Sequence, residues 1–313
     1  MVDFMKNLFK LHRIGTLIWM VLNAAIITII MATVIIPTAL PSLPEWSYYV
    51  IGALFYFLCI LAAISPAGEV IMRLLNGARK IKDPAITARL QPLFDEVYAK
   101  AKTKTPGLPD NIRLYTKEDD SFNAFAMGRK TISVNYGLLR ASDEEIKAVL
   151  AHEFGHLAHH DTDTLTIVVI GNVIVGLFFV VFRLIWRIFS WIFSFLASLS
   201  ANSFWGAFWT AIVSFGTRAL IDFFLTACFS AWTFLGVAVC HAGGREDEYR
   251  ADIFSCECGY TRAYLDFLQF LMSKEGKKRP KGLARALQAT HPSTSKRIAR
   301  VNQWLQEQGQ LAQ

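Results

Sequence analysis

Two histidines four residues apart, with a glutamate directly after the first, are the residues of this chain best suited to chemistry. His152 and His156 enclose Glu153 in the sequence His-Glu-Phe-Gly-His. A helix turns once in about 3.6 residues, so both imidazoles would share a face and could bind one divalent metal. Two neutral nitrogen ligands suit zinc, and an open coordination position is typical of a catalytic site.

The residues before this motif predict the helix that it needs. Ser142 is a good helix cap, and Glu145 three residues later completes a capping box. Apolar residues then recur at helical spacing through Phe154, which places the motif in mid-helix. Gly155 costs about 1 kcal/mol relative to alanine in a helix interior, and we expect another backbone to pack closely there.

A third metal ligand is expected, because catalytic zinc usually has three protein ligands and a water molecule. An acidic cluster follows a long apolar region and offers candidate carboxylates: Glu246, Asp247, Glu248 and Asp252. Glu248 and Asp252 would share a helix face, so one could bind the metal while the other orients a ligand histidine. Spacing alone leaves Glu246 and Glu248 both open as the ligand.

Composition predicts a membrane protein. Hydrophobic residues make up 53% of the 313 residues and charged residues only 18%, against about 25% in typical soluble domains. The net charge of +7 is interpreted as charge on the cytoplasmic side, which fixes membrane orientation. The sequence contains no recognisable nucleic-acid-binding module, so nucleic acid is not an expected partner.

Two uncharged apolar runs, at about residues 15–36 and 46–64, are long enough to cross a bilayer. The first is too long for a signal-peptide core, and we expect it to be a retained helix. Lysine and arginine flank the pair but are absent from its Pro-rich link, which predicts cytoplasmic flanks.

Residues 165–239 are almost wholly apolar but contain three arginines and Asp222. We predict spans at about residues 165–182 and 219–239, with the aromatic stretch 186–217 lying at the interface or dipping into the membrane. Two more short spans in that stretch are the alternative. Either way the number of crossings is even, because the metal motif and its third ligand must reach one compartment.

The expected fold is a mainly α membrane protein with about four transmembrane helices and a discontinuous cytoplasmic domain. The expected divisions are a transmembrane hairpin at 1–64, catalytic parts at 65–164 and 241–313, and a second transmembrane region with an aromatic interfacial insert at 165–240.

Five sequence segments together resemble the HtpX-type membrane metalloproteases, which are relatives of the CAAX prenyl proteases. The segments are His-Glu-Phe-Gly-His at 152–156, Glu-Tyr-Arg-Ala-Asp at 248–252, Asn-Ala-Phe-Ala at 123–126, Thr-Ile-Ser-Val at 131–134, and His-Pro-Ser-Thr at 291–294 with Arg297. The long aromatic stretch before Ala219 departs from the family pattern. The similarity covers most of the chain from about residue 73 onwards.

The resemblance implies a zincin-like α+β fold for the cytoplasmic domain, with a small edge-stranded sheet, and a role for each matching residue. His152, His156 and Glu248 would bind one Zn2+, Glu153 would be the general base, and Asp252 and Arg297 would support the ligands. His291 would lie near the site and could donate a hydrogen bond to the developing oxyanion. The substrate would bind as an added strand at an edge formed near 131–134. The implied substrate-binding residues are Asn123, Ala124, Phe125, Thr131 and Ser133.

The expected activity is that of a zinc endopeptidase in the bacterial inner membrane that cleaves membrane or misfolded proteins on the cytoplasmic side. Zinc-activated water would attack the peptide carbonyl, with Glu153 as the base. The resemblance implies a role in protein quality control and stress response, with lipid bilayer and protein substrates as partners. The alternatives are a processing protease for one, possibly lipidated, peptide, and a non-catalytic membrane scaffold or metal sensor.

Overall fold

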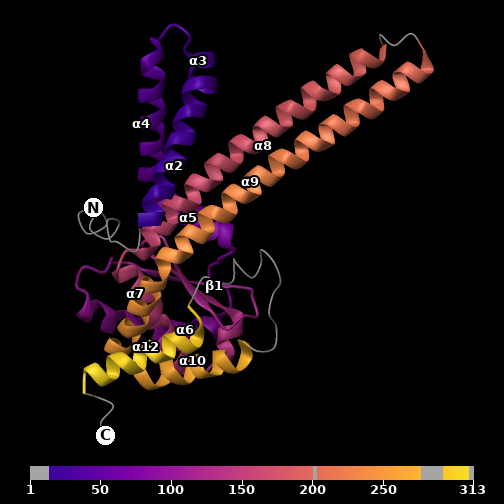
Figure 1. The fold of residues 1–313 in the computed structure, drawn as a ribbon. Helices are drawn as coiled ribbons and strands as arrows, with labels where there is room; N and C mark the ends of the chain where they lie inside the picture. The colour runs from indigo at the N-terminus through magenta and orange to yellow at the C-terminus, as the bar shows by residue number, and fades with distance from the viewer. Residues whose placement is uncertain (1–13, 200–202, 276–291, 310–313) are drawn as a thin grey trace.

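The computed structural model describes residues 14–199, 203–275 and 292–309. Membrane-type helices and a mixed α+β domain alternate along the chain (Figure 1). The elements before the sheet are α2 Ile14–Ile30, a π-helical turn Met31–Ile35, α3 Ile36–Ala39, α4 Glu45–Ala63, α5 Pro66–Asn76 and α6 Pro84–Lys104. The strands are β1 Arg113–Lys117, β2 Ala124–Met127 and β3 Thr131–Asn135, followed by a 3-10 turn Tyr136–Arg140. The later elements are α7 Asp143–Ala158, α8 Asp161–Leu199, α9 Phe204–Ser255, a π-helical turn Cys256–Tyr260, α10 Thr261–Glu275 and α12 Thr294–Glu307.

Four helical segments of the described chain are long and apolar enough to cross a membrane: Ile14–Ala39, Glu45–Ala63, Asp161–Leu199 and Phe204–Gly236. They form two hairpins that leave the same side of the α+β domain and diverge from each other (Figure 1). Their outer faces carry exposed Leu, Ile, Val, Phe and Trp side chains, which a hydrocarbon environment stabilises and water would not. The chain is therefore an integral membrane protein that contacts lipid.

Buried polar contacts join the two hairpins near the domain. The Trp19 indole N–H donates to Asn172 Oδ1 at 3.1 Å, and the Asn23 amide donates to the same oxygen at 3.3 Å. Trp19 also packs on Trp232, with ring centroids 4.1 Å apart. These contacts link α2 to both α8 and α9, so the hairpins are packed together at their base.

Within the described residues, the aromatic stretch 186–217 continues α8 and α9 as the outer part of the second hairpin. Helix α8 runs without interruption for 39 residues, which corresponds to about 58 Å, and α9 begins at Phe204 and runs for 52 residues. The spans predicted at about 165–182 and 219–239 are therefore parts of longer helices. Asp222 joins the two helices by accepting from Arg183 at 3.1 Å and from Arg187 at 2.8 Å.

The small sheet has the strand order β1-β3-β2, with β3 parallel to β1 and antiparallel to β2. The prediction that residues 131–134 form an edge strand is therefore wrong. All five residues of β3 are buried, because the strand is paired on both sides. The edge strands are β1 and β2, and in β2 Ala124 pairs with Val134 and Met127 with Thr131.

Helix α7 lies in the centre of the domain core. It begins at the predicted capping box, in which the Ser142 side chain accepts from the Glu145 N–H and the Glu145 carboxylate accepts from the Ser142 N–H. The helix is buried from Ala148 to Gly155, including the metal motif. Around it pack α6, the sheet, α10 and α12 through one cluster of buried side chains.

Gly155 is where α7 meets α9. A Cβ at this position would lie 3.0 Å from the Cα of Ala251 and 3.1 Å from the Cβ of Phe254. The expected close approach of another backbone is confirmed. Ala251 is only three residues after Glu248. The contact between Gly155 and Ala251 therefore also sets the distance between the Glu248 carboxylate and the two histidines of α7.

We expect Gly155→Val to lower the thermal midpoint of the domain and to weaken metal binding. Overpacking of a close contact costs about 1–3 kcal/mol, and the added methyl groups would push α9 and Glu248 away from α7. Thermal unfolding and metal content of the detergent-purified protein measure both effects. Gly216→Val in α9 is the matched helical control, because a Cβ there meets nothing within 4 Å. Equal losses in both variants would contradict this account.

Candidate metal centre and active site

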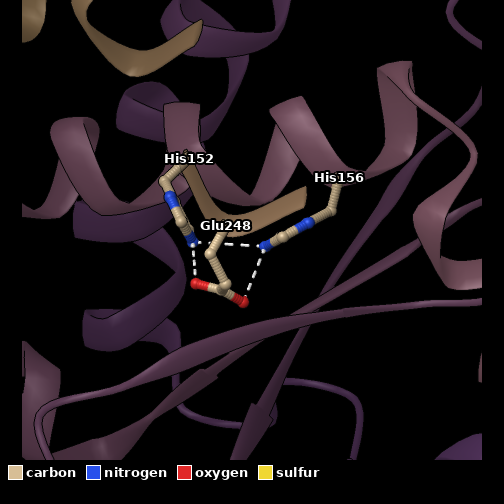
Figure 2. A group of neighbouring side chains, drawn as sticks. All are labelled: His152, His156 and Glu248. Carbon is tan, nitrogen blue, oxygen red and sulfur yellow. Dashed lines mark hydrogen bonds and ion pairs between the residues drawn. The ribbon is translucent and has the colours of Figure 1, made fainter. Parts of the chain in front are cut away.

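Three candidate metal-binding side chains converge between α7 and α9 (Figure 2). His152 Nε2 and His156 Nε2 lie 3.2 Å apart. Glu248 reaches between them, with Oε2 at 3.6 Å from His152 Nε2 and Oε1 at 3.5 Å from His156 Nε2. All three side chains are at least half-buried, whereas Glu246 is exposed to solvent. The structure thus separates the two carboxylates that spacing left open, and Glu248 is the one at the histidines.

These separations fit a tetrahedral zinc ion. Two ligand atoms at about 2.0–2.1 Å from a tetrahedral centre lie about 3.3 Å from each other, close to the 3.2 Å found between the two imidazole nitrogens. Two imidazoles and one carboxylate also form a donor set known from zinc hydrolases, with a fourth position left for water. The residues present therefore fit the metal.

The charge around His156 also favours a cation. Burial lowers the pKa of His156, but its hydrogen bond to Asp161 and the nearby charges of Glu248 and Glu153 raise it overall to about 10. Three carboxylates so close to one half-buried imidazole give the centre an excess of negative charge. A bound divalent cation would neutralise that charge without a proton on the histidine.

His152 is held from behind by a buried network. Asp252 Oδ1 lies 3.0 Å from His152 Nδ1, and the Tyr264 hydroxyl lies 2.9 Å from the same nitrogen. Arg297 donates to Asp252 through Nε at 3.0 Å. Burial raises the pKa of Asp252, but Arg297 and His152 lower it overall, so the carboxylate stays ionised and fixes the Nε2 of His152 toward the metal position.

His156 is oriented by Asp161, whose Oδ2 lies 3.1 Å from its Nδ1. Asp161 also accepts from Arg250 at 3.1 Å. Sequence reasoning missed both Asp161 and Tyr264. Asp161 lies five residues after His156, so its proximity was readable from the sequence, whereas Tyr264 has no local signal because it lies 112 residues from the histidine that it contacts.

Glu153 faces the edge strand. Its Oε2 accepts a hydrogen bond from the Ala126 N–H at 2.7 Å. Both residues line a cavity of about 470 Å3 together with His156 and Glu248. The lining also includes three of the predicted substrate-binding residues, Asn123, Ala124 and Phe125.

Thr131 and Ser133 lie away from this cavity. Both side chains are fully buried in the central strand β3, and the Thr131 hydroxyl accepts from Arg73 at 3.2 Å. They lie in the central strand, and positions 131 and 133 share one face of the sheet because side chains alternate along a strand. Arg297 lies behind the centre, 3.9 Å from Glu248 Oε2. His291 lies outside the described residues.

Comparison with known proteins identifies this arrangement. The model of peptidase family M48 matches residues 84–305, which include both histidines, Glu153 and Glu248. The chain belongs to peptidase family M48. Membership of this family implies a metal, for which the His-His-Glu cluster is the candidate site.

Relatives within family M48 carry the name HtpX, which confirms the predicted resemblance. An HtpX homologue of Acidiphilium cryptum is 43% identical over 30% of this chain and 32% of that protein. One from Levilactobacillus brevis is 31% identical over 41% of this chain and 42% of its own length. Protease HtpX of Alkalilimnicola ehrlichii is 29% identical over 50% and 55%. The chain thus spans about half or less of the length of these relatives.

The crystal structure of S. mikatae Ste24p is also similar, with a TM-score of 0.41 and 20% identity. The match covers 85% of this chain and 60% of that one.

Proposed function

We propose that this chain is a zinc-dependent endopeptidase that hydrolyses peptide bonds of membrane or misfolded proteins on the cytoplasmic side of a bacterial inner membrane. The observation that carries the proposal is the joint placement of the His152, His156 and Glu248 donors, the Glu153 carboxylate and the edge strand β2 around one cavity. A non-catalytic scaffold or sensor would need the metal donors but not the carboxylate and the strand edge beside them.

In this proposal His152, His156 and Glu248 hold the metal. Bound zinc supplies a Lewis acid and lowers the pKa of water. Glu153 accepts a proton from the attacking water and later passes it to the leaving amine nitrogen. Asp252, Tyr264 and Arg297 keep His152 in the orientation that binds metal, and Asp161 does the same for His156.

The edge of β2 would bind the substrate backbone. Peptide groups alternate along a strand, and the Ala126 N–H points away from β3 toward Glu153. The backbone groups of Ala124 therefore also face the cavity, whereas Phe125 pairs with Ser133. A substrate strand added here is recognised mainly through its backbone, which favours broad sequence specificity.

The cavity extends from the metal centre to the base of the membrane hairpins. Its lining includes Thr16 of α2, Met72 of α5 and Leu165 of α8. This continuity favours substrates that lie close to the membrane surface. It also supports a second candidate, a processing protease for a lipidated peptide, because a lipid chain and a transmembrane segment would reach the cavity by the same route.

Arginine and lysine distribution supports the cytoplasmic placement of the domain. Basic residues flank the first hairpin at both domain-side ends, and the sequence of its outer link, 37–45, has none. The hairpin carries its link on the side away from the α+β domain (Figure 1).

The test is cleavage of an unfolded soluble protein by the wild-type chain in detergent. We expect one zinc ion per chain, cleavage that stops when a chelator removes the metal, and recovery when zinc is restored. A lipidated short peptide is assayed in parallel. Cleavage of the lipidated peptide alone would favour the processing protease, and metal binding without cleavage of either substrate would contradict the proposal.

A further inference from the structure

The turn between β2 and β3, residues 128–130, is held by a carboxylate from α5. Glu69 Oε1 accepts the backbone N–H of Arg129 at 2.8 Å and also that of Lys130. Gly128 has a φ of +54°, and a Cβ there would lie 2.4 Å from the Glu69 Cγ. The glycine thus allows the left-handed backbone conformation, and its missing side chain lets Glu69 approach the turn closely.

A second carboxylate holds the same turn from α8. Arg129 donates to Asp163 through Nε at 3.0 Å and through a terminal nitrogen at 2.8 Å, a two-pronged ion pair. Asp163 is 1% exposed and lies in the first turn of α8, where its negative charge also suits the helix dipole. His160 Nδ1 approaches the same carboxylate at 3.5 Å.

These two carboxylates lie next to different membrane hairpins. Glu69 lies on α5, which follows α4 after the capping residue Ser65, and Asp163 lies at the base of α8. The turn that both carboxylates contact directly follows Met127, the last residue of β2. One residue before Met127, Ala126 forms the hydrogen bond to Glu153. Side chains from α5, which follows the first hairpin, and from the base of the second hairpin therefore contact the turn within four residues of Ala126.

We propose that Glu69 and Asp163 are positioning residues that fix the edge strand β2 at its working distance from Glu153. The inference rests on the proposed peptidase function and deepens it, because it assigns the alignment of the substrate-binding edge to residues beside the two membrane hairpins. Loss of either carboxylate removes one of the two contacts that hold the turn. Strand β2 is then no longer fixed in one position relative to the metal centre, and the binding of an extended substrate strand weakens. A short substrate that forms no strand with β2 is insensitive to the loss.

Two measurements on the full-length protein in detergent test this proposal. Hydrogen exchange of residues 124–127 reports the order of the strand without any need for activity. Hydrolysis of an extended peptide and of a short blocked peptide reports its use. The variants are Asp163→Asn and Glu69→Gln, with Asp163→Glu as the conservative rescue. Asp95→Asn is the matched control, because Asp95 is exposed on α6 and accepts a hydrogen bond from Gln91 at 2.8 Å rather than from the turn.

In Asp163→Asn and in Glu69→Gln, we expect the amide hydrogens of β2 to exchange with solvent at least tenfold faster than in the wild-type protein. Both variants should retain zinc. Misplacement of a substrate-aligning group by about 1 Å costs up to about 100-fold, so kcat/KM for the extended peptide should fall about 10- to 100-fold, mainly through KM. The short peptide should be hydrolysed as by wild type, and Asp163→Glu should recover part of the loss.

Unchanged exchange in β2 in both variants would overturn the proposal, as would equal losses on the short and the extended peptide. If a variant fails to fold, Arg129→Gln removes the other half of the ion pair and supplies the same readout. A wild-type protein that cleaves neither peptide would defeat the peptidase proposal instead, and the exchange experiment would still decide whether the two carboxylates order β2.

Discussion

Replacement of Glu153 by glutamine is expected to leave zinc bound and to lower turnover by about 100- to 10,000-fold, the range supplied by general acid–base catalysis. Glutamine keeps the shape of the side chain and an oxygen that can still accept the Ala126 N–H. It has no carboxylate to take a proton from water. Metal content and cleavage of an unfolded protein, measured on the same preparation, separate the two effects.

Glu144→Gln is the matched control for that experiment. Glu144 lies on the same helix but in its first turn, where its side chain is 63% exposed and pairs with Lys147 at 2.9 Å. Its loss should change turnover little. Activity of Glu153→Gln within a few-fold of wild type would exclude Glu153 as the base, and loss of zinc from that variant would show that its carboxylate supports the metal site itself.

Replacement of Glu248 by alanine is expected to remove both zinc and activity. Loss of a group that merely supports a ligand costs about 10- to 100-fold in metal affinity, so loss of a ligand should exceed about 100-fold. The remaining imidazoles, 3.2 Å apart, would offer only two of three protein donors. Zinc titration with a competing chelator measures the affinity, and cleavage of an unfolded protein measures the activity.

Glu246→Ala supplies the control for this second variant, because Glu246 is exposed on the same helix, two residues away. It should bind zinc and cleave as wild type does. The reverse pattern, with zinc retained by Glu248→Ala and lost from Glu246→Ala, would mean that α9 turns its other face to the histidines and that the ligand assignment is wrong.

Local sequence patterns determined the parts of the site that depend on one helix. The capping box at Ser142 and Glu145 starts α7, and the four-residue spacing of His152 and His156 then places both rings on one side, because helical geometry is short-range. The apolar runs likewise predicted membrane helices, since the length of a span follows from bilayer thickness.

The family resemblance, rather than spacing, selected Glu248 over Glu246 before the fold was known. In the structure the choice follows from the contact of Gly155 with Ala251, which sets the rotation and approach of α9. The sequence contains the glycine but does not say which backbone packs against it. That backbone belongs to α9, a helix that begins some fifty residues further along the chain.

The sequence by itself therefore determined the helix that carries His152 and His156, the place of Glu153 on it and the membrane character of the chain. Only the tertiary structure decided that β3 is the central strand and β2 an edge strand of the described sheet, since strand order depends on which strands pair and not on their composition. It also decided that Tyr264 lies against His152, 112 residues away in the chain. Contacts of this kind are set by packing of the whole domain rather than by local propensity.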